Sequence, residues 1–321
     1  MGTTNIKDHH ADVLIIGGGM VGSAVAFGIA ERGARVIMLD EGDRAFRAAR
    51  GNAGLVWYQG KGQGMRRYQE WSLEATHLWP EFTERLHHLT GIDVSYRKPG
   101  GLSLCLGEEG FESRKNLMEQ IRQEAAPHTY DCEMLDRKTV QELLPKIKLG
   151  DTMVGASYSM HDGHVNPLSL LMALHKGFKR FGGFYYPGQA VFNINRKEKE
   201  FIAHTPKGSF SAPKLVIAAG NGTGRLAQMV GMHIPVTPEK GQVLITERAR
   251  PCLPLPCHSF RQTAEGNFLL GSSQEKMGYD VQTKPKVIQN IANRAKTTLP
   301  MLADLRIACL RIYASSAAGP H

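Results

Sequence analysis

The chain has 321 residues, of which 42% are hydrophobic and 21% charged, as is ordinary for a soluble globular protein. No apolar run reaches the roughly 18 residues of a membrane-spanning helix, and the polar start MGTTNIKDHH lacks the apolar core of a secretory signal. Peripheral membrane contact stays open. The net charge is +9, but the basic residues are scattered, so we expect no nucleic-acid partner.

The five cysteines are dispersed along the chain. Even the nearest two, Cys252 and Cys257, lack the CxxC spacing of a zinc or iron–sulfur site and stand among prolines. We therefore expect no metal. Reduced thiols suit the cytoplasm, which is the expected location.

Residues 11–42 give the clearest functional signal. An apolar run over 11–16 predicts a buried parallel strand, and 35–39 predicts a second strand after an intervening helix. A glycine fingerprint in this strand–helix–strand context is typical of adenine dinucleotide binding. Without that context, a plain glycine-rich turn would be the alternative.

The fingerprint is Gly17-x-Gly19-x-x-Gly22. Gly17 allows the tight turn after the strand, Gly19 lets a pyrophosphate approach the backbone, and Gly22 lets the helix pack on the sheet. Met20 and Val21 begin the helix, whose free N–H groups favour a phosphate.

An acidic pair closes the second strand. Asp40 stands 23 positions after Gly17, near the separation of about 20 expected for a carboxylate that binds the ribose. Glu41 follows it. Because a carboxylate repels a 2′-phosphate, the pattern disfavours NADP.

Further elements follow in chain order. After Asp40 we predict an extended loop over 43–64, a long helix over 66–89 and a hairpin over 93–105. Two further helices are predicted over 111–125 and 136–144. The turn His161–Pro167 then leads into a helix with Asn166 as its N-cap. Strands are predicted over 189–193, 200–205, 214–220, 239–247 and 267–271, and a helix over 285–299.

This order predicts an α/β chain with two interleaved domains and a substrate pocket at their interface. A Rossmann-like nucleotide-binding domain, with a parallel sheet and helices, would contain 11–90 and 151–235. A smaller α+β substrate domain on an antiparallel or mixed sheet would contain 91–150 and 236–305. Residues 1–10 would form a flexible tail, and 306–321 an atypical end.

Four stretches together resemble the D-amino-acid oxidase and glycine oxidase superfamily of FAD-dependent amine oxidoreductases. They are the fingerprint, ARGNAGLVW, DGHVNP, and the stretch from Lys214 to Glu247. RGNAGLVWYQGKG and RQTAEGNFLLGSSQEKMGYD are also similar to the flavin-bearing β-subunits of opine oxidase, hydrogen cyanide synthase and D-hydroxyproline dehydrogenase.

The resemblance implies a bound FAD and hydride transfer from the carbon beside nitrogen to flavin N5, which gives an imine. The substrate would be a D-amino acid, glycine, a proline-like imino acid or an opine. Partner subunits or an electron-transfer chain would be further partners.

The resemblance also assigns cofactor contacts. Lys61, among Gly60, Gly62 and Gly64, would bring a cation to the flavin N1–C2 edge, or would be a solvated loop lysine. Val191 would contact the adenine through its backbone. A stretch with small residues would lie beside the flavin ring and the pyrophosphate, namely Arg50, Gly51, Asn52, Ala53 and Gly54. A second flavin strand would end at Ala219, Gly220 and Gly222.

Enzymes of this type hold the substrate carboxylate with an arginine, whose planar fork donates two charge-assisted hydrogen bonds. Arg261 is the candidate, with Gln262 beside it, and the alternative is a surface residue. His258 and Tyr279 are candidate pocket residues, whereas His164 is interpreted as a turn residue.

The resemblance fails at the end of the chain. The family continues with an arginine–proline and aspartate–glycine segment and a helix that clamps the flavin ring, whereas Cys309–His321 reads differently. Whether this chain holds FAD or turns over without that segment stays open. A non-catalytic, truncated flavoprotein-like subunit and an NAD-dependent dehydrogenase are therefore the alternative functions.

Overall fold

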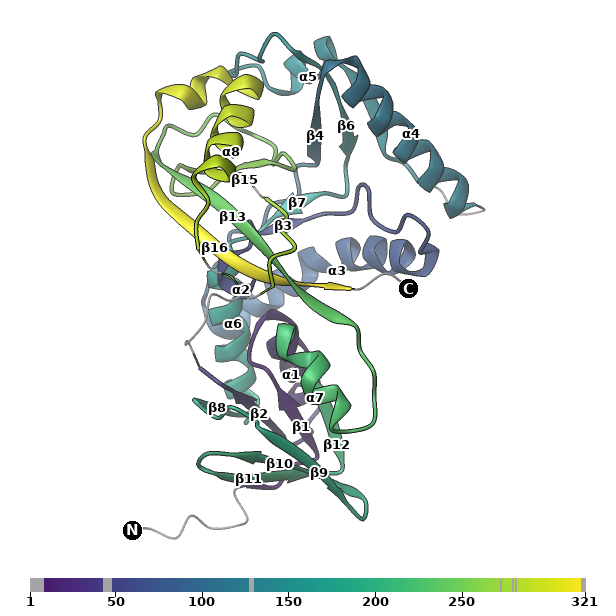
Figure 1. The fold of residues 1–321 in the computed structure, drawn as a ribbon, viewed down its shortest axis with the longest axis vertical. Coiled ribbons are helices and arrows are strands. Elements are labelled where there is room, and N and C mark those ends of the chain that lie inside the picture. The colour runs from purple at the N-terminus through teal and green to yellow at the C-terminus, as the bar shows by residue number, and fades with distance from the viewer. Residues whose placement is uncertain are drawn as a thin grey trace.

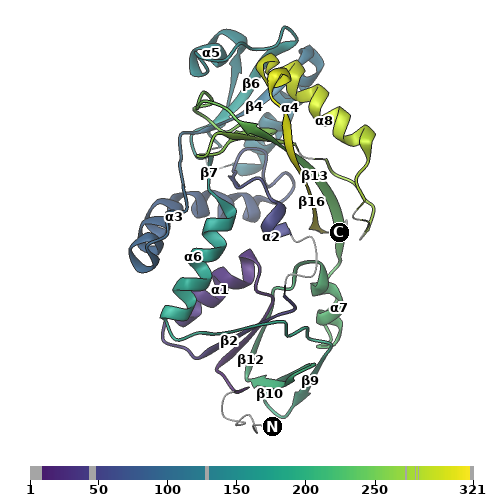
Figure 2. The ribbon, with the colours of Figure 1, turned by 90° about the vertical axis from the view of Figure 1, so that its left-hand side faces the viewer.

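The structure is a computed structural model and describes residues 9–42, 48–126, 130–271, 273–278, 280 and 282–318. Two regions follow one another along the long axis of the molecule (Figure 1). One is built on a parallel sheet and the other on antiparallel sheets covered by helices. Figure 2 shows the long helices α3 (Arg66–Thr90) and α6 (Pro167–Arg180) between the two sheet regions.

The parallel sheet has the strand order β12-β1-β2-β8. Its core is strongly apolar because β1 and β2 are covered on both faces, and Leu14, Ile15, Ile37 and Met38 are fully buried. The strands are β1 (Val13–Ile16), β2 (Val36–Asp40), β8 (Phe184–Pro187) and β12 (Lys214–Ile217).

Alternate residues of these strands pack on different layers. Ile15 and Met38 pack against α1 (Met20–Ala30) and α6, whereas Leu14 and Leu39 pack against a three-stranded antiparallel sheet. That sheet contains β9 (Asn193–Lys197), β10 (Glu200–Thr205) and β11 (Gly208–Ala212). The short η2 (Gly220–Gly222) and α7 (Thr223–Gln228) follow β12.

The second region contains two antiparallel sheets with the strand orders β14-β15-β13-β16 and β4-β6-β5. An isolated bridge between Leu102 and Cys257 joins them. The strands are β4 (Gly101–Leu106), β5 (Glu133–Asp136), β6 (Met153–Ser159), β13 (Val236–Arg248), β14 (Phe260–Gln262), β15 (Asn267–Gly271) and β16 (Ile307–Ala318).

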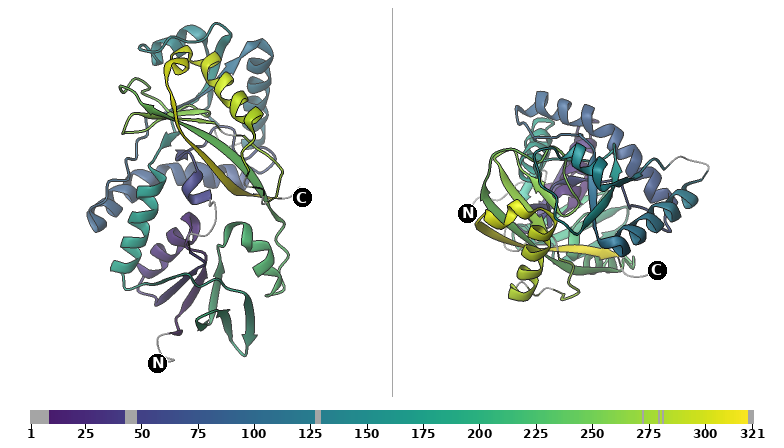
Figure 3. Two further views of the ribbon diagram at one scale, coloured as in Figure 1. Left: turned by 60° about the vertical axis from the view of Figure 1, so that its left-hand side comes forward. Right: turned by 90° about the horizontal axis from the view of Figure 1, so that it is seen from above.

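Helices cover both faces of this second region (Figure 3). The helices α5 (Arg137–Leu143) and α8 (Pro285–Thr298), with η3 (Pro300–Asp304), enclose a core that includes Ala156 and Phe268. Helix α4 (Gly107–Ala125) packs on the other face of β6, where Arg114 binds Ser157. Short elements connect the regions: α2 (Ala48–Gly51), β3 (Leu55–Val56) and β7 (Gly163–His164).

Most of the predicted elements are confirmed, including the two helix caps. Asn166 caps α6 by accepting from the backbone N–H of Leu168 at 3.1 Å, and Asp136 caps α5 by accepting from that of Thr139 at 2.8 Å. The predicted α/β class with a Rossmann-like parallel sheet is also confirmed. Within the described residues, no helix combines the length and apolar character needed to cross a bilayer.

Some local predictions were wrong. The hairpin over 93–105 does not form, because β4 pairs with β6, about fifty residues away, instead of with its own neighbour. The loop over 43–64 contains α2 and β3 in its described part. A strand expected at 189–193 begins at Asn193 as β9, and β8 and β16 were not predicted. The pairings of β8 with β2 and β16 with β13 are long-range, so local patterns carry little sign of them.

Candidate flavin and substrate site

The fingerprint glycines differ in what surrounds them. Gly17 has φ of +112°, and a Cβ there would lie 2.3 Å from the oxygen of Ala218. A Cβ at Gly22 would lie 1.9 Å from the oxygen of Gly17. At Gly19 the nearest heavy atom would be the Cβ of Ala49, at 4.0 Å. The first and third glycines are thus needed for chain packing, while the second leaves bare backbone open to a ligand.

The turn after β1 is braced by buried side chains. The Asp40 carboxylate, 6% exposed, accepts from the backbone N–H of Gly18 at 2.7 Å and from that of Gly42 at 2.9 Å. The Ser23 hydroxyl donates to the Gly18 oxygen at 3.0 Å, and His175 Nε2 lies 3.0 Å from the same oxygen. Asp40 therefore links the turn after β1 to the end of β2, where the ribose was predicted to bind.

His175, on α6, was not found by sequence reasoning. Burial lowers the pKa of its imidazole, so the neutral ring contacts Gly18 and lies 2.7 Å from the Ser23 hydroxyl oxygen. Its position depends on how α6 packs against α1, and no local motif marks it. Glu41, predicted beside the ribose, is exposed next to Asp40.

The second glycine-ended strand lies beside the first. β1 and β12 pair in parallel, with Ile16 opposite Ile217, so their carboxyl ends meet at one edge of the sheet. Gly220 adopts φ of +54° and begins η2, and the Gly222 N–H donates to the Ala219 oxygen at 3.0 Å. The structure thus brings Ala219, Gly220 and Gly222 to the fingerprint turn.

The segment 48–54 lies between the two regions. Asn52 closes it, because its side-chain oxygen accepts from the Gly54 N–H at 2.8 Å. A Cβ at Gly51 would lie 2.3 Å from Tyr313 Cβ, and one at Gly54 would lie 2.2 Å from the Val165 oxygen. Small residues are therefore required here by neighbouring chain segments. Arg50 lies in α2, and the half-buried Ala53 follows it.

The other predicted cofactor residues are more dispersed. Val191 is 5% exposed in the core beneath β1 and β2, and its oxygen accepts from Arg225 Nη2 at 3.1 Å. At the start of α1, Met20 is half-buried and Val21 is 68% exposed. Val21 is therefore open to solvent at the start of the helix, whereas the Val191 side chain belongs to the core.

A buried network of hydrogen bonds holds the backbone of the loop around Lys61 in place. Asp162 is fully buried, and it accepts from the Tyr58 N–H and from Gln59 Nε2 at 2.7 Å. Gln59 Oε1 in turn accepts from Arg114 Nη2 at 3.0 Å. Burial raises the pKa of Asp162 to about 6. Lys61 itself is half-buried, and the network fixes the backbone that carries it.

Arg261 is a buried cation rather than a surface residue. It is 5% exposed, and its Nη1 donates to the Val165 oxygen at 3.2 Å and lies 3.2 Å from His164 Nδ1. Burial lowers its pKa to about 10, so it stays charged at neutral pH. Burial first, then Arg261 and Arg97, lowers the pKa of His164 to about 4, so that imidazole is neutral.

Part of the Arg261 guanidinium is unsatisfied. Within the described chain no carboxylate forms an ion pair with it, and its Nε is buried without a hydrogen-bond partner. The Glu265 carboxylate acts on the guanidinium electrostatically without forming an ion pair, and an anionic ligand would compensate the buried charge further. Because Val165 also contacts Gly54, the structure places Arg261 next to the predicted flavin segment.

The neighbours of Arg261 have other roles. Gln262 holds an adjacent loop, since its Oε1 accepts from the Cys252 N–H at 2.9 Å. The exposed His258 has its ring 5.8 Å from that of Trp57, whose Nε1 is buried without a partner. Tyr279 lies outside the described residues. Among the residues described, no cluster of three or more His, Cys, Asp and Glu side chains suited to a metal occurs.

The sequence profile of a family described as FAD dependent oxidoreductase matches residues 12–319. The chain belongs to this FAD-dependent oxidoreductase family. FAD is thus its cofactor, as predicted, and the open backbone at Gly19 beside the second glycine-ended strand suits a dinucleotide. The alternative of an NAD-dependent dehydrogenase is set aside.

Comparison with individual proteins narrows the class of flavoprotein to which the chain is similar. The chain is 36% identical to one subunit of the opine oxidase of Agrobacterium tumefaciens over 93% of its length and 80% of the relative's. It is 26% identical to glycine oxidase of Geobacillus kaustophilus, covering 91% of this chain and 78% of that one. The crystal structure of glycine oxidase from Geobacillus kaustophilus superposes with a TM-score of 0.87 at 24% identity, covering 97% and 84% of the two chains. The chain is accordingly an oxidoreductase that acts on amino-acid-like substrates.

Proposed function

We propose that this flavoenzyme oxidises the C–N bond of an amino or imino acid by hydride transfer from the carbon beside nitrogen. The observation that carries the proposal is the buried Arg261 guanidinium beside the Gly54 segment, whose Nε has no hydrogen-bond partner. A carboxylate is the anion that a planar guanidinium binds with two parallel hydrogen bonds. A substrate anchored there is held next to the small residues predicted to border the flavin.

The residues of the chain would bind and orient rather than exchange protons. Gly19 and the start of α1 would hold the pyrophosphate, and Asp40 would hold the ribose. His164, with a pKa of about 4, would fix the guanidinium as a neutral acceptor. FAD, when bound, supplies the hydride acceptor, and the oxidised amine leaves as an imine. Because a pre-aligned carbon needs proximity more than a base, the reaction suits a site of this kind.

The name of one relative bears on substrate and partners. The relative from Agrobacterium tumefaciens is by name one subunit of an enzyme that oxidises opines. This supports an opine among the candidate substrates, which also include glycine, D-amino acids and proline-like imino acids. It further supports another polypeptide as a partner subunit. The described cysteines are free thiols, which agrees with a cytoplasmic location.

The proposal is tested by anaerobic addition of amines to the purified, FAD-loaded full chain. We expect an opine, glycine, D-proline or hydroxyproline to bleach the flavin absorbance near about 450 nm. Arg261→Met should keep the yellow colour but be bleached much more slowly by the same substrate. A yellow protein that none of these amines bleaches would contradict the proposed reaction.

A further inference from the structure

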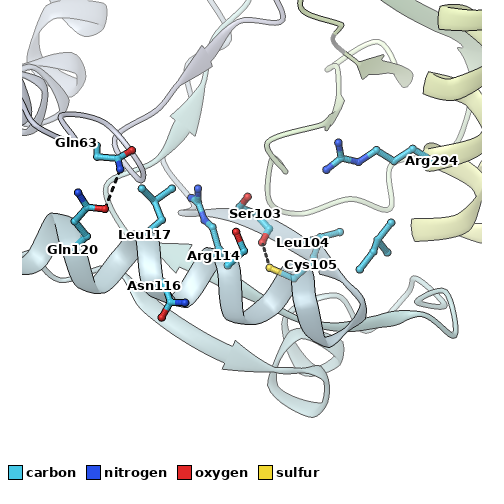
Figure 4. A pocket seen from close by; sticks show the side chains of 12 residues that line it. Gln63, Ser103, Leu104, Cys105, Arg114, Asn116, Leu117, Gln120 and Arg294 are labelled. Carbon is cyan, nitrogen blue, oxygen red and sulfur yellow. Dashed lines mark hydrogen bonds between the residues drawn. The ribbon is translucent and has the colours of Figure 1, made fainter.

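Two arginines line a cavity in the antiparallel region. Arg114 and Arg294 border a space of about 650 Å³ between β4, α4 and α8 (Figure 4). Such cations attract anions, but none of the residues that line this cavity is among the predicted contacts of FAD. The expected place for the pyrophosphate is instead the fingerprint turn after β1, where the donors are backbone N–H groups.

One peptide unit of that turn carries a free donor. The Gly19 N–H has no hydrogen-bond partner within the described residues, and a Cβ at Gly19 would meet nothing closer than 4.0 Å. This N–H shares its peptide unit with the Gly18 carbonyl. Because a peptide unit is planar and almost always trans, its C=O and N–H point in opposite directions. Whatever holds the Gly18 carbonyl therefore also sets the direction of the Gly19 N–H.

Two side chains hold the Gly18 carbonyl. Its oxygen accepts from the Ser23 hydroxyl at 3.0 Å, and His175 Nε2 lies 3.0 Å from that oxygen and 2.7 Å from the Ser23 hydroxyl oxygen. A carbonyl oxygen only accepts, and Ser23 has a single hydroxyl proton, which it donates to Gly18. The His175 Nε2 therefore carries a proton and is the second donor. On the other side of Gly18, its N–H donates to Asp40 Oδ2 at 2.7 Å.

The packing of α6 fixes the His175 ring. Leu174 and Phe178 on the same helix are fully buried, and a Cβ at Gly177 would lie 2.6 Å from the Phe27 ring of α1. The ring of Tyr185, on β8, meets that of His175 edge-on with 4.5 Å between the ring centres. The imidazole is thus placed by three packed elements, and it reaches the turn as a rigid donor.

The imidazole also limits the freedom of the Ser23 hydroxyl. That hydroxyl has an alternative acceptor in the Met38 sulfur, 4.0 Å away. With the His175 N–H directed at the Ser23 oxygen, the hydroxyl proton has to point away from the ring, and the Gly18 oxygen is there to accept it. Without the imidazole, the carbonyl would keep one donor that can rotate to another acceptor.

We propose that His175 is a positioning residue for FAD, which orients the Gly19 N–H toward the pyrophosphate by holding the Gly18 carbonyl. The residue acts through the backbone and does not touch the cofactor in this role. A side chain on α6, 157 positions from the turn, thereby contributes to cofactor affinity. This inference rests on the proposed function for the placement of the pyrophosphate at Gly19, and it is independent of the amine that is oxidised.

A matched pair of variants tests the inference, because Asn and Gln carry the same amide at different reach. Calorimetric titration of the flavin-free full chain with FAD and with ADP, which share the pyrophosphate, measures the effect. His175→Asn is too short to reach the carbonyl and should weaken both ligands about tenfold, as for the loss of one hydrogen bond. His175→Gln should recover most of the affinity. His88→Asn, at an exposed position of α3, is the control and should leave both affinities unchanged.

Phosphorus NMR of the bound FAD separates positioning from a general loss of structure. The two pyrophosphate resonances should shift in His175→Asn and lie close to their wild-type positions in His175→Gln. Thermal unfolding of the flavin-free variants shows whether they are folded. If His175→Asn does not fold, His175→Leu, which is of similar length but has no donor, carries the same expectation.

Each result bears on the inference in a different way. Wild-type affinity in a folded His175→Asn or His175→Leu would overturn it, and so would an equal loss in His175→Asn and His175→Gln, since the donor would then not be the cause. If Gly19→Val also bound FAD as tightly as the wild type, the pyrophosphate placement itself would fail. Loss of affinity in Gly19→Val with wild-type affinity in His175→Asn would leave that placement standing and reject the role of His175 alone.

Discussion

In the parallel-sheet region the site is formed by backbone, whereas in the antiparallel region it is formed by buried side chains. Gly17, Gly19 and Gly22 act through the side chains they lack. Arg261, His164 and Asp162 instead act through charge and hydrogen bonds at buried or half-buried positions. A cofactor shared by a whole family can be held by backbone, while substrate choice depends on side chains that each chain positions for itself.

The largest expected effects are those of the glycine substitutions, which separate folding from cofactor binding. Gly22→Ala should lower both, since its Cβ would overlap the Gly17 oxygen. Gly19→Val should leave the ligand-free fold intact but weaken FAD binding by about a hundredfold or more, because the side chain fills the open backbone. Thermal unfolding and flavin fluorescence titration measure the two effects.

Gly28→Ala is the matched control on the same helix. Its Cβ would meet only the far end of the Arg32 side chain, 3.7 Å away, so the helix should gain about 1 kcal/mol of stability without losing FAD. If Gly19→Val binds FAD as well as Gly28→Ala does, the open backbone is not the pyrophosphate site.

On the substrate side, Arg261→Met should lower activity without lowering stability. Loss of the carboxylate contact should lower kcat/KM by about a hundredfold or more, chiefly through KM. Removal of a buried cation that forms no ion pair within the described residues should leave the free energy of unfolding of the ligand-free protein unchanged or increased. Steady-state kinetics and urea unfolding test this, and a strongly destabilised Arg261→Met would indicate a structural role instead.

The pH dependence of stability should reveal two neighbouring groups with opposite trends. The folded-state pKa of Asp162 is raised from 3.8 to about 6, so its stabilising contribution is present at low pH and is lost as pH rises through 6. The pKa of His164 is lowered from 6.5 to about 4, so its contribution is present above 6.5 and is lost as pH falls through 4.

Single variants should separate these trends. Compared with the wild type, Asp162→Asn should become progressively more stable as pH rises from about 4 to 6.5, and His164→Gln progressively less stable. Urea unfolding at several pH values across that window measures the difference. Variants whose stability runs parallel to the wild type would show that neither group titrates there.

The smallest expected effect concerns Lys61. If its ammonium lies at the flavin edge, Lys61→Met should lower the two-electron potential of bound FAD by about 20 mV, the equivalent of roughly 1 kcal/mol from a half-exposed charge. Lys199→Met, on the exposed turn between β9 and β10, is the matched control and should leave the potential unchanged. Spectroscopic titration against a reference dye measures both, and equal potentials would remove Lys61 from the flavin edge.

Much of the cofactor side could be predicted because its determinants are local. The spacing of three glycines, an acid at the end of the second strand and the LVIAA stretch before Gly220 all lie within short segments. The structure brings β1 and β12 together as parallel neighbours, so these segments meet at one edge of the sheet. What local signals missed was His175, which reaches Gly18 from 157 positions away.

The substrate side was less predictable for the same physical reason. Arg261 could be singled out by residue type, but its burial results from the pairing of β14 with β15 and from contact with His164, 97 positions away. Asp162, Gln59 and Arg114 form one network although they come from three separate segments. Such side chains become a site only after long-range packing.

The Tyr313 side chain has a consequence for how the molecule unfolds. On β16 it lies where a Cβ at Gly51 or at Gly241 would overlap it, so one side chain fills the space left by glycines of α2 and β13. Separation of α2 from this antiparallel sheet would expose the ring together with the Gly51 surface. Helix α2 and the sheet should therefore lose their structure together rather than one after the other.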